Sequence, residues 1–183
     1  MYVALAEHVG TSGMIRLERG LAGEPSLHGY LLGCSPALGL VHCFDDFEPD
    51  GYTLFRVEDV LTLTRGPHEE HWDKMLKGEN LLGGLQTPTE VNLSDLPTAM
   101  AAIQKQYADL IIECEDEGDD EVDFYLGRIL EVTNELIALH YIDALGHWDE
   151  SPTLIPIRRI TKVQYDTPYL RRFMRYADPF PTH

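Results

Sequence analysis

A segment of seventeen residues occurs twice in this chain, and this internal repeat limits the possible folds more than any other feature. Residues 29–45 align without a gap with residues 127–143, at a constant offset of 98 positions. The identical pairs are Gly29/Gly127, Leu32/Leu130, Leu38/Leu136, His42/His140 and Asp45/Asp143. We therefore expect two related halves of roughly 80 to 90 residues each, a common size for a small domain.

The repeat continues past a loop whose length differs between the two copies. Residues 46–51 form this loop in the first copy, and residues 144–152 form a longer loop in the second. The match then resumes at an offset of 100, where apolar positions 55, 57, 60 and 63 correspond to 155, 157, 160 and 163. Alternation of this kind is typical of strands.

Each half contains the same series of expected elements. Strands are expected at 14–19, 27–35, 38–44, 53–57 and 60–63, and again at 108–114, 124–133, 136–142, 153–157 and 160–163. Helices are expected at 67–77 and 168–177, which begin with a proline, and at 94–107, where apolar residues recur at helical spacing. The corresponding division is a first repeat at 1–80, a linker at 81–93 and a second repeat at 94–183.

This pattern predicts a mainly β protein with helices, of the α+β class. Four or five short strands in about 40 residues suit a small, strongly bent antiparallel barrel. Residues 27–60 and 125–163 resemble the repeats of bacterial proteins of unknown function that are built from two tandem Sm-like, or SH3-like, small barrels. The resemblance implies two such barrels, each followed by a helix. Sm proteins hold uridine-rich RNA through a set of loop residues that has no match here, so RNA binding is not implied.

The composition restricts the partners and the compartment. The chain has 14 basic and 31 acidic residues, and its net charge of −17 opposes binding to phosphate backbones, so we expect no nucleic-acid partner. Its three cysteines have no paired spacing and are expected to be reduced thiols, which indicates the cytoplasm. No secretory signal pattern and no run of about 20 apolar residues is present, so we expect no membrane association.

Both copies contain a histidine followed three positions later by an aspartate, His42/Asp45 and His140/Asp143. An imidazole and a carboxylate together can serve acid–base catalysis or bind a metal ion. Residues three apart on a strand point to opposite faces, however. We favour a structural interpretation, in which the histidine bonds a backbone group and the aspartate caps the following loop.

The longer loop of the second copy contains the strongest candidates for a binding surface. These are His147, Trp148 and Asp149, because an exposed tryptophan in a loop can anchor a partner. Tyr52 occupies roughly the same place in the first copy. The alternative interpretation is that Trp148 folds back and packs over the end of the second half.

Two further motifs resemble metal sites only in part. His68 and His71 are one residue closer than in the helical zinc motif, and no third ligand can be named. Residues 109–123 contain nine acidic residues, but their spacing does not follow that of a calcium-binding loop. We interpret the two motifs as a solvated helix face and a solvated hairpin tip, and we expect no metal ion and no cofactor.

Basic residues are concentrated near the C-terminus, at Arg158, Arg159, Lys162, Arg171, Arg172 and Arg175. They can form a small site for an anionic ligand or nucleic acid, or they can neutralise acidic residues elsewhere in the chain. Arg158 and Arg159 correspond to Glu58 and Asp59 in the first copy. Opposite charges at equivalent positions can set how the two halves, or two chains, pack together.

The function that this sequence favours is a non-enzymatic binding or assembly module that acts on a protein partner or on itself. No convergent set of catalytic residues is visible, and exposed edges of small barrels suit strand addition. Two alternatives stay open. One is RNA binding through the C-terminal basic segment, and the other is a metal-dependent or hydrolytic activity around His140, Asp143 and His147.

Overall fold

The two halves of the chain contain the same elements in the same order. The structure, a computed structural model, describes residues 1–10, 13–21, 26–84, 91–115 and 122–181. The first half contains α1 (Tyr2–Ala6), β1 (Ile15–Arg19), β2 (Ser26–Cys34), β3 (Leu38–Asp45), β4 (Glu48–Arg56), the 3-10 turn η1 (Val57–Asp59), β5 (Val60–Thr64) and α2 (Pro67–Gly78). The second half contains α3 (Leu96–Gln104), β6 (Asp109–Glu115), β7 (Val122–Val132), β8 (Leu136–Tyr141), β9 (Thr153–Pro156), η3 (Ile157–Arg159), β10 (Lys162–Tyr165) and α4 (Pro168–Phe173). A further 3-10 turn, η2 (Leu81–Gly84), follows α2.

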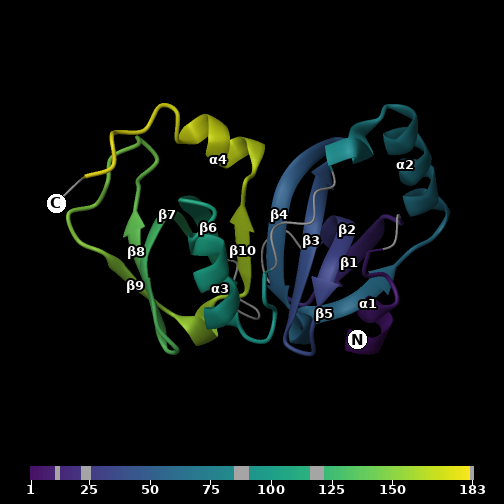
Figure 1. Cartoon of the computed structure of the whole chain (residues 1–183), viewed down its shortest axis with the longest axis horizontal. Coiled ribbons are helices and arrows are strands. Elements are labelled where there is room, and N and C mark those ends of the chain that lie inside the picture. Colours follow the sequence, from purple (N-terminus) through teal and green to yellow (C-terminus); the bar gives the residue numbers. More distant parts are fainter. Residues whose placement is uncertain (11–12, 22–25, 85–90, 116–121, 182–183) are drawn as a thin grey trace.

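All ten strands belong to one antiparallel sheet, in the order β5-β1-β2-β3-β4-β10-β6-β7-β8-β9. The order β5-β1-β2-β3-β4 of the first half is repeated as β10-β6-β7-β8-β9 in the second. The halves meet where β4 pairs with β10, and we call this pairing the joint. In its register Tyr52 lies opposite Tyr165, and Phe55 lies opposite Lys162. The two halves lie side by side, with β4 and β10 between them (Figure 1).

The expectation of two small closed barrels, each followed by a helix, is wrong. Helices do follow β5 and β10, but the strands form one continuous open sheet. Pairing between β4 and β10 satisfies the backbone groups that each half would otherwise leave unpaired at that edge. The sequence pattern did not show this, because short alternating strands suit closure within a half and pairing between halves equally well. The mainly β content is as expected.

The identical glycines of the repeat are explained by the close approach of two strands. A Cβ atom on Gly29 would lie 2.0 Å from the carbonyl oxygen of His42, and one on Gly127 would lie 2.1 Å from that of His140. A shift in register follows each glycine on its own strand, after Leu31 in β2 and after Ile129 in β7. Only glycine therefore fits at positions 29 and 127, and each strand then has an irregularity at an equivalent place shortly after its glycine.

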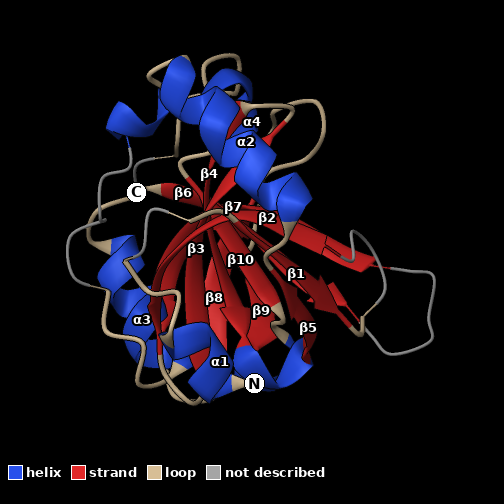
Figure 2. Cartoon of the chain, turned by 90° about the vertical axis from the view of Figure 1, so that its right-hand side faces the viewer, coloured by secondary structure: helices blue, strands red, loops and turns tan. Residues whose placement is uncertain are grey.

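The largest hydrophobic core extends across the joint. It includes Leu54 of β4 and Val163 of β10, each 1% exposed, together with Met100 and Ile103 of α3, which are fully buried. α2 and α4 lie at one end of the strands, and α1 and α3 lie at the other (Figure 2). Because residues of both halves share this core, separating the halves would expose apolar surface to water.

The helices begin where capping residues allow. Asp95 accepts a hydrogen bond from the backbone N–H of Thr98 at the start of α3, and Thr167 does the same for Leu170 at the start of α4. The sequence did not indicate α1, although its Leu5 is fully buried. Among the described residues, no helix has the length and apolar character needed to cross a bilayer.

Candidate functional site

The loop of residues 144–152 is folded against the second half rather than extended into solvent. The Trp148 ring lies 5.0 Å from that of Phe180 and 5.5 Å from that of His140, and its indole N–H donates to the carbonyl of Asp178 at 2.9 Å. The side chain is only partly exposed, whereas His147 and Asp149 are exposed. This geometry matches the packing interpretation of Trp148.

His140 and Asp143 do not form a pair. The Nε2 atom of His140 lies 2.6 Å from the carbonyl oxygen of Asp149, and the Asp143 carboxylate accepts hydrogen bonds from the backbone N–H groups of Leu145 and His147. The histidine thus fixes the returning loop, and the aspartate caps its turn. His147 Nδ1 lies 3.4 Å from Asp143 on the exposed surface. The three side chains do not converge on a common site.

In the first half, His42 and Tyr52 are buried within aromatic packing, whereas Asp45 is exposed. The His42 ring stacks on Tyr52 at 4.7 Å, and Tyr52 stacks in turn on Tyr165 across the joint at 5.2 Å. Tyr52 is 6% exposed, so it contributes to the joint and is not a surface residue. Burial lowers the pKa of His42 and raises that of Tyr165. His42 is therefore neutral near pH 7, which suits a packing role.

Half of the C-terminal basic residues are neutralised by acidic neighbours. Arg159 lies 2.7 Å from Asp123, Arg171 lies 2.6 Å from Asp166, and Lys162 lies 2.8 Å from Glu113. The remaining three are exposed: Arg158, Arg172 and Arg175. Arg159 pairs with Asp123 within its own half, so this ion pair does not use the charge reversal relative to Glu58 and Asp59. That hypothesis stays a prediction.

The partial metal motifs gain no support from the geometry of the described residues. His68 and His71 are both exposed on α2, and no group of three or more ligand-type side chains in the described ranges could hold a metal ion. The tip of the acidic segment, residues 116–121, lies outside the described residues. Its flanks belong to β6 and β7, and they contain a feature that the sequence did not reveal.

Buried charges connect the halves at the end of β6. Arg19 of β1 donates two hydrogen bonds to Glu115 of β6, at 2.7 and 2.5 Å, and the two side chains are 1% and 0% exposed. The hydroxyl of Thr161 donates to the same carboxylate at 2.7 Å. Next to it, Glu113 accepts from Gln164 at 2.6 Å and pairs with buried Lys162. A buried ion pair needs such additional hydrogen bonds to offset its desolvation.

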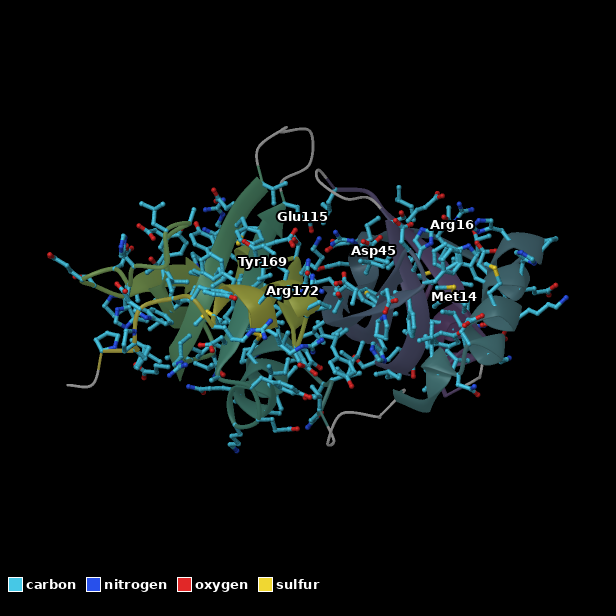
Figure 3. All side chains as sticks on the ribbon, turned by 90° about the horizontal axis from the view of Figure 1, so that it is seen from above. Met14, Arg16, Asp45, Glu115, Tyr169 and Arg172 are labelled. Carbon is cyan, nitrogen blue, oxygen red and sulfur yellow. The ribbon has the colours of Figure 1, made fainter. Side chains whose placement is uncertain are left out.

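Two polar cavities lie beside the joint. One, of about 320 Å³, is lined mainly by β2, β3, β4 and β10, and includes Lys162 and Gln164 of β10 and Trp72 of α2. The other, of about 710 Å³, is lined by the turn between β3 and β4 and by α4, and includes Asp45 and Arg172. These two labelled side chains come from different halves and lie on either side of the joint in Figure 3. Acidic groups of the first half and basic groups of the second thus meet there.

The sheet has two outer strands, β5 and β9. The direction of their backbone groups follows from the hairpins of the first half, β2–β3 and β3–β4, and from the repeat. Ser35 N–H donates to the Leu38 carbonyl, and Val57 N–H donates to the Ala37 carbonyl. Because successive residues of a strand point to alternate sides, Leu54 must direct its N–H away from β3 and toward β10. In the joint its partner Val163 then faces β4.

By the repeat, Leu63 of β5 corresponds to Val163 of β10 and directs its backbone groups outward, where no strand of the described residues follows. Thr62 and Thr64 face β1, with which β5 pairs. Leu61, beside this edge, is 65% exposed, and Thr62 is exposed as well. An outer strand with free N–H and C=O groups can receive another strand. The β5 edge is thus the best candidate binding surface.

The sequence led us to expect exposed edges suited to strand addition, but not which strand forms such an edge, because the pattern places strands without their neighbours. Equivalent residues in the two halves, such as Val163 and Leu63, have different surroundings only because of the order of strands in the sheet. The signal that could have found it was the repeat itself, since two joined copies must leave one unmatched edge at each end.

Comparisons with protein-family models, with curated proteins and with solved structures find no match to this chain.

Proposed function

We propose that this chain is a non-enzymatic binding module that receives an extended segment of a protein partner at the β5 edge. The observation that carries the proposal is the outer position of β5, with its outward-directed backbone groups and the exposed Leu61 beside them. Strand addition provides affinity through main-chain hydrogen bonds, and neighbouring side chains provide selectivity. No partner strand within the described chain occupies this edge.

The charge of the chain narrows the class of partner. A net charge of −17 attracts basic protein segments and repels nucleic acids. The pairing of Arg159, Lys162 and Arg171 with carboxylates weakens the case for RNA binding by the C-terminal segment. We therefore propose a basic or neutral extended peptide segment as the occupant. None of the three cysteines is in a disulfide within the described part of the chain, which supports a reducing compartment, and we propose the cytoplasm.

The test uses a pair of matched variants at the two outer strands. Leu61→Lys places a charge on the β5 edge, and lysine on an outer strand discourages strand addition. Leu154→Lys places the same charge on the β9 edge, where the leucine is 61% exposed, close to the 65% of Leu61. Peptides selected from a displayed library of extended sequences on the wild-type chain should lose binding to Leu61→Lys and keep binding to Leu154→Lys. Equal binding to both variants would contradict the proposal.

A second readout locates the bound peptide. Amide hydrogen exchange of Leu63 should slow when a selected peptide binds, because its N–H then donates to the added strand. Exchange of Thr62, already bonded to β1, should change little. Protection that appears elsewhere while Leu63 stays unchanged would place the binding surface away from β5.

A further inference from the structure

The joint shows what a contact between two copies of this chain would look like. β9 has the same place in the second half as β4 has in the first, and β5 has the same place as β10. Inside the chain β4 pairs with β10. The equivalent pair, β9 and β5, lies at opposite ends of the sheet, so it can meet only between two copies.

Two prolines distinguish β9 from β4 at this edge. At the offset of 100, Pro152 and Pro156 stand where the first half has Tyr52 and Arg56. Ile157 N–H donates to the Glu135 carbonyl, so Ile155 and Thr153 direct their N–H groups toward β8. Positions 152, 154 and 156 therefore point outward, and proline has no N–H to donate. Only Leu154 retains an outward donor.

The residues that the prolines replace stabilise the joint through their side chains as well. Arg56 donates from Nε to the Ile160 carbonyl at 2.7 Å and from a terminal nitrogen to the Ile157 carbonyl at 2.8 Å. Tyr52 stacks on Tyr165 at 5.2 Å. At β9 both the backbone donors and these side-chain contacts are missing, at the same two positions.

We infer that β9 and β5 form a latent interface between copies of this chain, and that Pro152 and Pro156 keep it closed. The register of the joint, transferred to this interface, places Leu154 opposite Leu63 and Ile155 opposite Thr62. Such a contact is head-to-tail, so repeated contacts generate a ring or an open filament. The two prolines thus limit the sheet to the two repeats of one chain, and the β5 edge stays accessible. The inference concerns a second copy only, and it stands whether or not β5 binds another protein.

The test restores the joint residues in the full-length chain. Sedimentation velocity should show the wild type at one chain mass, 20.7 kDa, over the whole concentration range. Pro152→Tyr with Pro156→Arg should produce multiples of this mass, in a proportion that rises with concentration. Pro152→Ala with Pro156→Ala restores the N–H donors alone and should produce the same species more weakly. Circular dichroism and melting curves establish that each variant is folded.

Leu61→Lys, added to either double variant, should return the protein to one chain mass, because the charge lies beside the β5 edge that accepts β9. The inference is overturned if both folded double variants stay at one chain mass at the highest concentration. It is also overturned if their assemblies persist with Leu61→Lys, or if the wild type already forms assemblies that Leu61→Lys dissolves. If Pro152→Tyr with Pro156→Arg fails to fold, Pro152→Ala with Pro156→Ala decides.

Discussion

Removal of Arg19 tests whether buried charges hold the two halves together. Its side chain is 1% exposed, and its guanidinium donates two hydrogen bonds to Glu115, which is fully buried. Breaking one partner of such a pair typically costs about 3–5 kcal/mol, because the other charge is left buried without compensation. In Arg19→Met, Glu115 keeps the Thr161 hydroxyl at 2.7 Å and Lys162 at 4.0 Å. We therefore expect a loss near the lower end, about 3 kcal/mol of unfolding free energy.

The assay is urea unfolding at pH 7, followed by circular dichroism. An exposed ion pair provides the control, since Arg171 and Asp166 have side chains that are 55% and 38% exposed. Arg171→Ala should cost only about 0–1 kcal/mol. The double variant Arg19→Met with Glu115→Met should cost less than Arg19→Met alone, because no buried charge is then left unpaired. A loss of unfolding free energy for Arg19→Met no larger than that for Arg171→Ala would refute the reasoning. A double variant whose loss equals the sum of the losses of Arg19→Met and Glu115→Met, each measured alone, would refute it as well.

Two further changes test the pH dependence and the repeat glycines. Burial raises the pKa of the Asp59 carboxyl to about 6, so the folded chain binds this proton more tightly than the unfolded chain and loses stability as pH rises from about 4 through 6. Asp59→Asn removes this loss. In urea unfolding, the unfolding free energy of the variant relative to wild type should increase by roughly 1 kcal/mol from pH 5 to pH 7.5, after allowance for solvent screening. A difference between variant and wild type that stays constant across this range would contradict the assignment. Gly127→Ala should cost on the order of 2–4 kcal/mol, because the added Cβ would lie 2.1 Å from a backbone oxygen. Gly78→Ala, which meets nothing within 4 Å at the end of α2, should be neutral or slightly stabilising in the same melts, and similar losses for both would show that the close approach does not matter.

The order of the elements was predictable from the sequence, because the repeat and the apolar spacing are local signals. Most strands and helices lie close to their expected positions, and α3 begins at Leu96, directly after its capping Asp95. Two bounds were wrong: β4 begins at Glu48, inside the loop expected at 46–51, and α4 ends at Phe173 rather than at residue 177. Whether the strands close into a barrel within each half or form one open sheet was not predictable. Whether β4 returns to its own half or pairs with β10 depends on contacts more than 100 residues apart, such as that of Arg56 with Ile160, and alternation contains no information about them.

The candidate site was predictable only in part. The interpretation that Trp148 packs against its own half rests on a loop motif, and the structure shows the contacts that hold it. The buried state of Glu113 and Glu115 was missed, because a run of acidic residues ordinarily indicates a solvated segment. Tyr52 was expected at the surface but is buried, and the sequence did not indicate this because its stacking partner Tyr165 is distant along the chain. Glu115 and Tyr52 have partners in the other half, and Glu113 has its partners about fifty residues further along in its own half, so no local pattern shows their environment.

Amide hydrogen exchange at two equivalent leucines tests most directly whether the halves form one sheet with unequal edges. Leu54 directs its N–H into the joint, where Val163 lies opposite, whereas Leu154 directs its N–H outward from the last strand. We expect exchange of Leu54 to be slow, near the rate of global unfolding, and exchange of Leu154 to be fast. Equal rates at the two positions would contradict a continuous sheet joined through β4 and β10.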